Sequence, residues 1–224
     1  MSDSSTTVSD PVASEPVVYV VDDDEGVRRA LARLIRSVGL ETQAFPSAES
    51  FLEQPLLDRP ACLILDLRLR GPSGLDLQAE LGQRQQAVPI IFISGHGTVP
   101  ASVRAMKGGA LDFLQKPFDR DELLERVQQA LARSRDACRE RAEQAAIRRR
   151  FDMLTPRERE VLRLVVRGML NKQIAAELGA AEKTIKIHRG RVMKKMEADS
   201  VAGLVWLIQK LGLESFAHEP RGTR

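Results

Sequence analysis

The chain contains few aromatic residues, only two cysteines and no long apolar run. Aromatic residues make up 4% of the 224 residues and apolar residues 43%, so any buried core must be largely aliphatic. No run approaches the roughly 18 apolar residues of a membrane-spanning helix. Cys62 and Cys138 lie far apart in sequence, one in a predicted buried strand and one in a predicted helix. Free thiols in a reducing compartment fit this arrangement better than a disulfide does. Together with the lack of a long apolar run, this favours a cytoplasmic protein without a membrane segment.

Residues 1–16 lack both the basic stretch and the apolar stretch of a secretory signal. Their polar composition predicts a disordered leader, and residues 214–224 are predicted to be a short tail. Neither segment is expected to contribute to a folded domain.

Charge is distributed unevenly along the chain, although the net charge is only +3. Residues 1–119 carry 11 basic and 16 acidic side chains, residues 120–150 carry 9 and 6, and residues 151–224 carry 14 and 9. An acidic front and a basic back favour contact with nucleic acid through the C-terminal part only. A solvated surface would carry the same charges, so charge alone does not decide between the two.

Short aliphatic runs alternate with segments of helical period through the first half of the chain. Runs that are apolar throughout are typical of strands covered by helices on both faces of a parallel sheet. The more polar run at 41–45 is typical of an edge strand. The alternation therefore predicts a doubly wound α/β domain. The predicted strands lie at about 17–22, 41–45, 61–66, 89–94 and 111–114.

Chemically active side chains stand at the ends of four of these runs. Asp22 and Asp23 follow the first run, Asp66 ends the third, Ser94 ends the fourth and Lys116 follows the fifth. The carboxyl ends of parallel strands share one edge of the sheet, where ligands gather. Clustered carboxylates repel one another, so a divalent cation such as Mg²⁺ is predicted to hold them. Each residue alone is more typical of a cap, a turn or a surface, but their joint spacing predicts a site that receives a phosphoryl group.

With these five residues in place, residues 17–119 closely resemble the receiver domain of bacterial two-component response regulators. The resemblance implies a flavodoxin-like (βα)₅ fold with strand order 2-1-3-4-5. It implies that a sensor histidine kinase phosphorylates Asp66, that Ser94 and Lys116 bind the phosphoryl oxygens, and that Phe113 is an aromatic switch. It also implies a Mg²⁺ site, whose ligands would be Asp22, Asp23, Asp66 and the backbone carbonyl of Arg68.

Two further positions of this segment carry expectations from the same resemblance. Receivers commonly have a cis peptide after the lysine, so a cis Lys116–Pro117 bond is expected, which would aim the ammonium back at the site. Arg70 stands where receivers usually have a proline. This departure would loosen the loop or add a cation near the phosphoryl group, and it leaves the loop geometry open.

The segment between Phe118 and Thr155 contains neither proline nor glycine. Leu124, Val127 and Leu131 form an apolar stripe, which fades along the rest of the segment. Residues 120–150 are therefore predicted to be a helical linker that extends the fifth receiver helix to about residue 148. The alternative is a helix that ends near residue 133 and is followed by a disordered, arginine-rich stretch.

Residues 151–213 contain the start and stop signals of four helices. Thr155 is predicted to cap the first helix and Asn171 the second. Gly179 is predicted to form a tight turn before a basic third helix at about 182–196. A short helix, a turn that contains glycine and a longer basic helix together describe a helix-turn-helix.

The stretches 154–158, 171–175 and 184–188 make this region resemble the LuxR/FixJ-type four-helix DNA-binding domain. The third helix would lie in the major groove, where base edges can be distinguished. Its residues Ile185, Val192 and Met196 are predicted to face the domain core. The predicted DNA contacts are Lys186, Ile187 and Arg191 near base edges, Lys172, Thr184, His188, Lys194 and Lys195 at phosphates, and Lys183 and Arg189 along the charged sides.

The order of the two regions is that of a FixJ-type response regulator: an α/β flavodoxin-like receiver, a long helical linker and a small all-α helix-turn-helix domain. Phosphorylation is predicted to promote dimerisation and binding to double-stranded promoter DNA, with activation the usual outcome and RNA polymerase a further partner. One alternative is a constitutive DNA-binding protein with an unused receiver. Another is an aspartyl-phosphate hydrolase, but such enzymes need a second aspartate where Arg68 stands, so an enzyme is not predicted.

Overall fold

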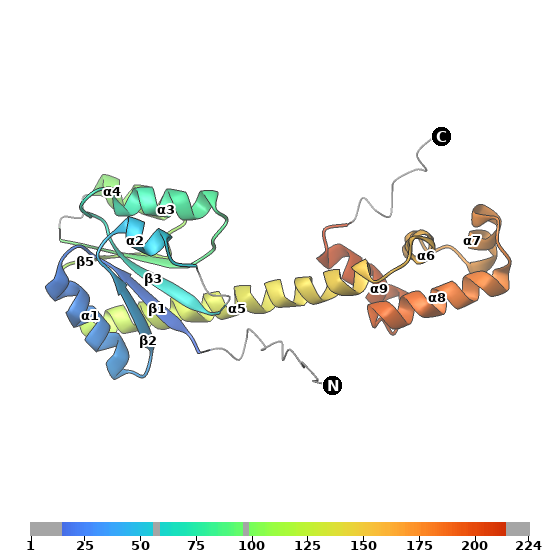
Figure 1. Ribbon diagram of the computed structural model, residues 1–224, viewed down its shortest axis with the longest axis horizontal. Helices are drawn as coiled ribbons and strands as arrows, with labels where there is room; N and C mark the ends of the chain where they lie inside the picture. Colours follow the sequence, from blue (N-terminus) through green and yellow to red (C-terminus); the bar gives the residue numbers. More distant parts are fainter. Residues whose placement is uncertain (1–14, 56–58, 96–98, 214–224) are drawn as a thin grey trace, which may run out of the picture. The chain divides into compact units, whose positions relative to one another are not determined.

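The computed structural model describes residues 15–55, 59–95 and 99–213. The chain divides into two compact units, Met1–Glu140 and Arg141–Arg224 (Figure 1). The predicted tail and all but the last two residues of the predicted leader lie outside the described residues. Across the described ranges, none of the helices has both the length and the apolar character to cross a membrane.

A five-stranded sheet of parallel strands forms the centre of the N-terminal unit in the described residues. Its order, β2-β1-β3-β4-β5, confirms the predicted flavodoxin-like fold, in which β2 is an edge strand. The register places Val21 beside Leu65, Asp66 beside Ile93 and Ser94 beside Gln115, so these strands end at one edge. The strands are β1 (Val17–Val21), β2 (Glu41–Phe45), β3 (Ala61–Asp66), β4 (Ile90–Ser94) and β5 (Asp112–Gln115).

Helices cover both faces of this sheet, as the wholly buried strands β1, β3 and β4 require (Figure 1). The buried residues of the core between the sheet and α1 and α5 are aliphatic apart from Cys62, with Ile35 and Val127 fully buried. The opposite core holds aromatic rings, among them Tyr19 and Phe51 with centroids 5.4 Å apart. The helices are α1 (Glu25–Ser37) and α5 (Arg120–Asp152) on one face, and α2 (Ala48–Leu52), α3 (Gly74–Gln83) and α4 (Val99–Lys107) on the other.

The loop that follows Asp66 is held close to the strand by Gly74. A Cβ atom at Gly74 would lie 2.3 Å from the carbonyl oxygen of Asp66, which is closer than two such atoms can approach. Ser73 begins α3 with a capping box, in which its hydroxyl accepts from the Asp76 N–H and the Asp76 carboxylate accepts from the Ser73 N–H. The absent side chain and the cap together fix how α3 leaves the carboxyl edge of β3.

The C-terminal unit contains a helix-turn-helix, in agreement with the predicted all-α domain. Gly179 adopts the left-handed conformation (φ 60°) at the turn between α7 and α8. Ile185, Val192 and Met196 are fully buried, which confirms that they face the core of the unit. Its helices are α6 (Pro156–Val166), α7 (Asn171–Leu178), α8 (Glu182–Met196) and α9 (Val201–Lys210), after the last turns of α5.

The start of α7 differs from the sequence-based prediction. Asn171 was expected to cap this helix, but the N-cap residue is Leu170 and Asn171 is the first residue of the helix. The side chain of Gln173 accepts from the Leu170 N–H at 2.8 Å, while Asn171 Oδ1 accepts from Arg189 Nη1 of α8 at 3.1 Å. Asn171 therefore connects α7 to α8, and the capping prediction was wrong because this tertiary contact competes for its side chain.

Helix α5 runs without a break from Arg120 to Asp152. Asp119 begins the helix, because its carboxylate accepts from the Asp121 and Glu122 N–H groups. The early part packs on the sheet of the N-terminal unit, where Ser134 Oγ accepts from the Ala61 N–H at 2.9 Å. The last turns belong to the core of the C-terminal unit through Ile147 and Phe151, which are 2% and 6% exposed.

Candidate functional site

The carboxyl edge of the sheet brings Asp22, Asp66 and Lys116 into direct contact. Lys116 Nζ lies 2.7 Å from Asp22 Oδ2 and 3.0 Å from Asp66 Oδ1, so one ammonium bridges two carboxylates. The peptide between Lys116 and Pro117 is cis, as expected from the sequence. The remaining oxygens of the pair accept backbone N–H groups, Asp22 Oδ1 from Asp24 and Asp66 Oδ2 from Arg68. This bridge between side chains from three strand ends is the centre of the candidate site.

Burial determines the electrostatic state of this cluster. Burial raises the pKa of the Asp66 carboxyl above its ordinary value, with Asp22 adding to the rise and Lys116 opposing it. Burial alone would lower the pKa of Lys116, but hydrogen bonds to Asp22 and Asp66 outweigh that effect and leave it raised. Lys116 thus stays an ammonium, while the Asp66 carboxyl binds a proton more readily than a free aspartate does.

Ser94 and Phe113 lie on the two strands next to this cluster. Ser94 ends β4 with 1% exposure, and its carbonyl oxygen accepts from the Lys116 N–H at 2.8 Å. Phe113 is half-buried on β5 and stacks on Phe92, with ring centroids 6.4 Å apart and planes 27° apart. Ser94 is therefore close to Lys116 through the backbone, and Phe113 packs beneath the edge on the side of the aromatic core.

The side chain of Asp23 contacts a residue outside the predicted site. Its Oδ2 atom lies 3.1 Å from Arg70 Nε, and its side chain is 26% exposed. Arg70 lies in the β3–α3 loop, whose geometry the sequence did not predict. Its guanidinium reaches across to Asp23 in the β1–α1 loop. A second unpredicted contact is the Arg28 guanidinium, whose Nη1 donates to the Asp22 carbonyl oxygen at 2.7 Å.

The donors at this edge fit a hard divalent cation by their chemistry. Carboxylates of Asp22, Asp23 and Asp66, with the carbonyl of Arg68, are the oxygen ligands that Mg²⁺ takes in proteins. Their present contacts are with cations of the chain itself, since Lys116 and Arg70 hold oxygens of all three acids. Accordingly, among the described residues no three Asp, Glu, His or Cys side chains are gathered closely enough to hold a metal ion. Binding would require these ion pairs to rearrange.

The second candidate surface is the outward face of α8. Ile187 is 48% exposed on this face. In the described part of the chain, Lys183, Lys186, Arg191 and Lys194 are exposed and form no ion pair with an acid. Thr184, and Lys172 at the start of α7, are exposed as well. These side chains give the helix-turn-helix a basic face with one apolar position.

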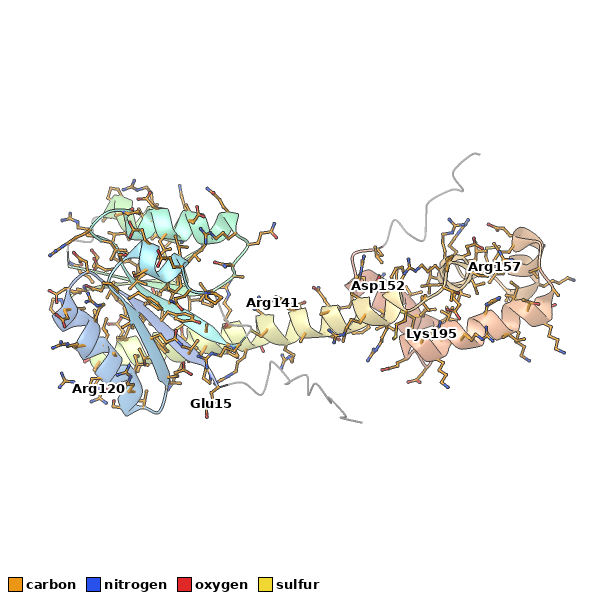
Figure 2. The ribbon with its side chains drawn as sticks, viewed as in Figure 1. Glu15, Arg120, Arg141, Asp152, Arg157 and Lys195 are labelled. Atoms are coloured by element: carbon orange, nitrogen blue, oxygen red, sulfur yellow. The ribbon has the colours of Figure 1, made fainter. Side chains whose placement is uncertain are left out.

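Three other residues of α8 that were expected to touch DNA are engaged within the protein or partly covered. Lys195 Nζ donates to Glu158 Oε2 at 2.6 Å and to the Met153 carbonyl at 3.1 Å, beside the end of α5 (Figure 2). Arg189 donates to Asn171, and His188 is half-buried, with its Nδ1 atom covered and without a hydrogen-bond partner. Lys195 and Arg189 therefore connect α8 to its neighbours, and a contact of either residue with DNA would compete with these bonds.

The ion pair between Glu158 and Lys195 predicts a loss of stability in acid. Glu158 is only 3% exposed; burial raises its pKa, but hydrogen bonds from Lys195 and the Thr155 N–H outweigh burial and leave the pKa lowered. A lowered pKa in the folded state stabilises the unit above the ordinary carboxyl pKa of about 4.3, and this contribution is lost as the pH falls through the folded value. Trp206 is the one tryptophan of the chain, so its fluorescence follows unfolding of this unit.

For Lys195→Met we expect about 1–3 kcal/mol lower stability at neutral pH, since Glu158 would lose its charged partner. Lys195 is 34% exposed, so the loss should stay below that of a fully buried pair. Between about pH 5 and pH 3 the variant should lose less further stability than the wild type. Lys194→Met removes the same charge from an exposed neighbour and is the control for stability. Parallel acid dependence in all three proteins would contradict the assignment.

Comparison with known proteins identifies both units. The family profile of the response regulator receiver domain matches residues 18–128, and that of bacterial regulatory proteins of the luxR family matches residues 152–208. The two profiles together cover most of the chain, in the order that the fold shows. The fold, the acidic edge and the helix-turn-helix thus define a regulator with a receiver and a DNA-binding domain.

The chain belongs to the two-component response regulators of the LuxR/FixJ type. It is 50% identical over 203 residues to nodulation protein W of Bradyrhizobium diazoefficiens, covering 91% of this chain and 89% of that protein. It is 42% identical over 189 residues to the transcriptional regulatory protein FixJ of Azorhizobium caulinodans, which covers 84% of this chain and 89% of that protein. The matched profile describes bacterial regulatory proteins, and FixJ is a transcriptional regulatory protein, so the chain is a transcription regulator and not an enzyme.

Solved structures agree with this assignment. The response regulator StyR superposes with a TM-score of 0.81 at 45% identity, over 88% of this chain and 100% of that one. Full-length FixJ from B. japonicum gives a TM-score of 0.52 at 38% identity, over 88% and 97%. The likeness extends over both domains.

Proposed function

We propose that this regulator is switched by transfer of a phosphoryl group from a sensor histidine kinase to Asp66. The contact of Lys116 with both Asp22 and Asp66 carries the proposal, because it gathers the expected acceptor, an acid and a cation at one sheet edge. In the transfer, a carboxylate oxygen of Asp66 attacks the phosphorus of the kinase phosphohistidine. The new P–O bond forms as the P–N bond breaks, and the kinase imidazole leaves with the bonding electron pair.

Each neighbouring residue has a role in this reaction that follows from its position. Lys116 would exchange the Asp66 carboxylate for a phosphoryl oxygen and so offset the added charge. The Ser94 hydroxyl, at the end of the adjacent strand, would donate to a second oxygen. Mg²⁺, held by Asp22, Asp23, Asp66 and the Arg68 carbonyl, would supply charge neutralisation at the transferring group.

The response would then spread along the face formed by α4 and β5. Ser94 ends β4, Phe113 lies within β5 and Lys116 directly follows β5. Movement of Ser94 and Lys116 toward the phosphoryl group would therefore draw Phe113 inward. Helix α4 already presents Val99, Val103 and Met106, which are 77%, 44% and 45% exposed. Apolar side chains this exposed fit a face that a second phosphorylated copy would cover.

In the dimer, two copies of α8 would read the half-sites of a two-fold promoter site. Lys186, Ile187 and Arg191 would lie nearest the base edges. Lys172, Lys183, Thr184 and Lys194 would contact phosphates, whereas the half-buried His188 is less accessible for such a contact. Activation, through RNA polymerase, is the proposed outcome.

The test measures DNA binding with and without phosphorylation. The full chain, with Mg²⁺ and a small phosphodonor, would be used to select bound duplexes from a random pool, and fluorescence anisotropy would then give the affinity for the selected site. We expect phosphodonor to convert the protein to a dimer by light scattering and to tighten binding at least several-fold. Equal affinity and an unchanged oligomeric state under both conditions would favour a constitutive DNA-binding protein instead.

A further inference from the structure

Arg70 forms an ion pair that the phosphoryl-transfer site does not require. Its Nε atom lies 3.1 Å from Asp23 Oδ2, and the two residues are 47 positions apart in sequence. The side chain of Arg70 is 90% exposed, whereas that of Asp23 is only 26% exposed. The contact therefore connects a solvent-exposed guanidinium to a partly buried carboxylate of the acidic edge.

The cations of the chain already neutralise much of the charge on this edge. Lys116 takes one oxygen of Asp22 and one of Asp66, and Arg70 takes one oxygen of Asp23. With both cations in place, three carboxylates carry a residual charge of about −1, whereas without Arg70 they would carry about −2. A divalent cation is attracted to such an edge in proportion to that residual charge, so Arg70 opposes its binding both by position and by charge.

We propose that Arg70 is a built-in competitor of the divalent cation for Asp23. The cation then binds fully only when the guanidinium leaves the carboxylate, so Arg70 sets the Mg²⁺ concentration at which the receiver becomes competent for phosphorylation. This inference rests on the proposed function, because it concerns the same cation site. It explains what the arginine does in a loop position where the resemblance led us to expect proline.

Arg70 suits this role better than Lys116 does. Lys116 contacts two carboxylates that are only 1% and 10% exposed, and in the proposed reaction it moves only from Asp66 to a phosphoryl oxygen, so it stays at the site throughout. An exposed ion pair such as Arg70–Asp23 is weak and opens readily. The neighbouring Gly71 has φ +94°, a conformation favourable to glycine, which turns the loop just after Arg70.

The test compares cation binding by the wild-type chain, Arg70→Gln and Arg29→Gln. Arg29 is matched because it also forms an exposed ion pair, with Glu25 on α1, and its removal changes the net charge equally. Affinity for Mg²⁺ would be measured by isothermal titration calorimetry, and for Mn²⁺ by water proton relaxation, so neither readout depends on phosphorylation. We expect Arg70→Gln to bind both ions about two- to tenfold more tightly than the other two proteins, with the difference narrowing as KCl is raised.

The outcomes separate this inference from the proposed function. Equal or weaker binding by Arg70→Gln, with measurable binding by the wild type, would overturn the role of Arg70 and leave the proposed function standing. A gain of the same size in Arg29→Gln would also overturn it, because the effect would then be one of net charge. Failure of all three proteins to bind either ion would overturn both the cation site and the inference.

Discussion

Asp66→Asn should abolish phosphoryl incorporation from a small phosphodonor in the presence of Mg²⁺. An amide nitrogen or oxygen cannot replace the ionised carboxylate as the attacking atom, so the loss should be essentially complete, not partial. Intact mass spectrometry of the full chain gives the measurement, as the wild type should gain the mass of one phosphoryl group and the variant none. DNA binding by the variant should match that of the untreated wild type.

The control for this experiment is Asp112→Asn. Asp112 begins β5, at the opposite end of the strand from Lys116, and pairs with Arg126 at 2.7 Å. The Asp112→Asn variant loses the same charge from the same domain, but the change lies away from the carboxyl edge of the sheet. It should therefore gain the mass of one phosphoryl group, as the wild type does. If Asp66→Asn gained a phosphoryl group to the same extent as the wild type, the proposal that Asp66 is the acceptor would be wrong.

Phe151→Ala should lower the stability of the C-terminal unit by about 3–5 kcal/mol, since a buried aromatic side chain would be replaced by a cavity. Phe151 is 6% exposed in the core of this unit, although it lies on α5, and the guanidinium of Arg159 lies 5.1 Å from its ring centroid. Denaturant unfolding followed by Trp206 fluorescence reports the C-terminal unit, and Tyr19, the one tyrosine, reports the N-terminal unit. Only the tryptophan transition should shift.

Met153→Ala is the matched control for Phe151→Ala. Met153 lies two residues further along the chain and is 60% exposed, so its truncation should cost well under 1 kcal/mol. If Phe151→Ala shifted the tryptophan transition no more than Met153→Ala does, the last turns of α5 could not be part of the folded core of this unit.

The sheet and its acidic edge were predictable because they depend on patterns local to the sequence. Each buried strand is an uninterrupted apolar run, and a polar residue at or just after the end of the run marks the carboxyl end of the strand. Parallel pairing then places Asp22, Asp66 and Lys116 at one edge, whatever the details of packing. The turn at Gly179 and the cap at Thr155 were likewise predictable, because a positive φ and a capping box need particular residues at particular spacings.

Contacts between side chains far apart in sequence could not be predicted in the same way. Lys194 and Lys195 are adjacent residues of the same type, yet Lys194 is exposed and Lys195 forms an ion pair. The difference depends on Glu158, which lies 37 residues before Lys195 in the sequence. The pairing of Arg70 with Asp23 spans 47 residues. The resemblance to receiver domains marked Arg70 as a departure, but its partner depends on how two loops meet at the sheet edge.

The place of Phe151 and Ile147 in the second core has a practical consequence for hybrid regulators. A fragment that started at residue 152, where the luxR-family match begins, would leave out both side chains and expose the apolar surface they cover. Fusing this DNA reader to a foreign sensory module should therefore keep the native helix from at least residue 141 onward. Junctions drawn at the family boundary should give chimeras whose DNA-binding domain is less stable, whatever the sensory module attached to it.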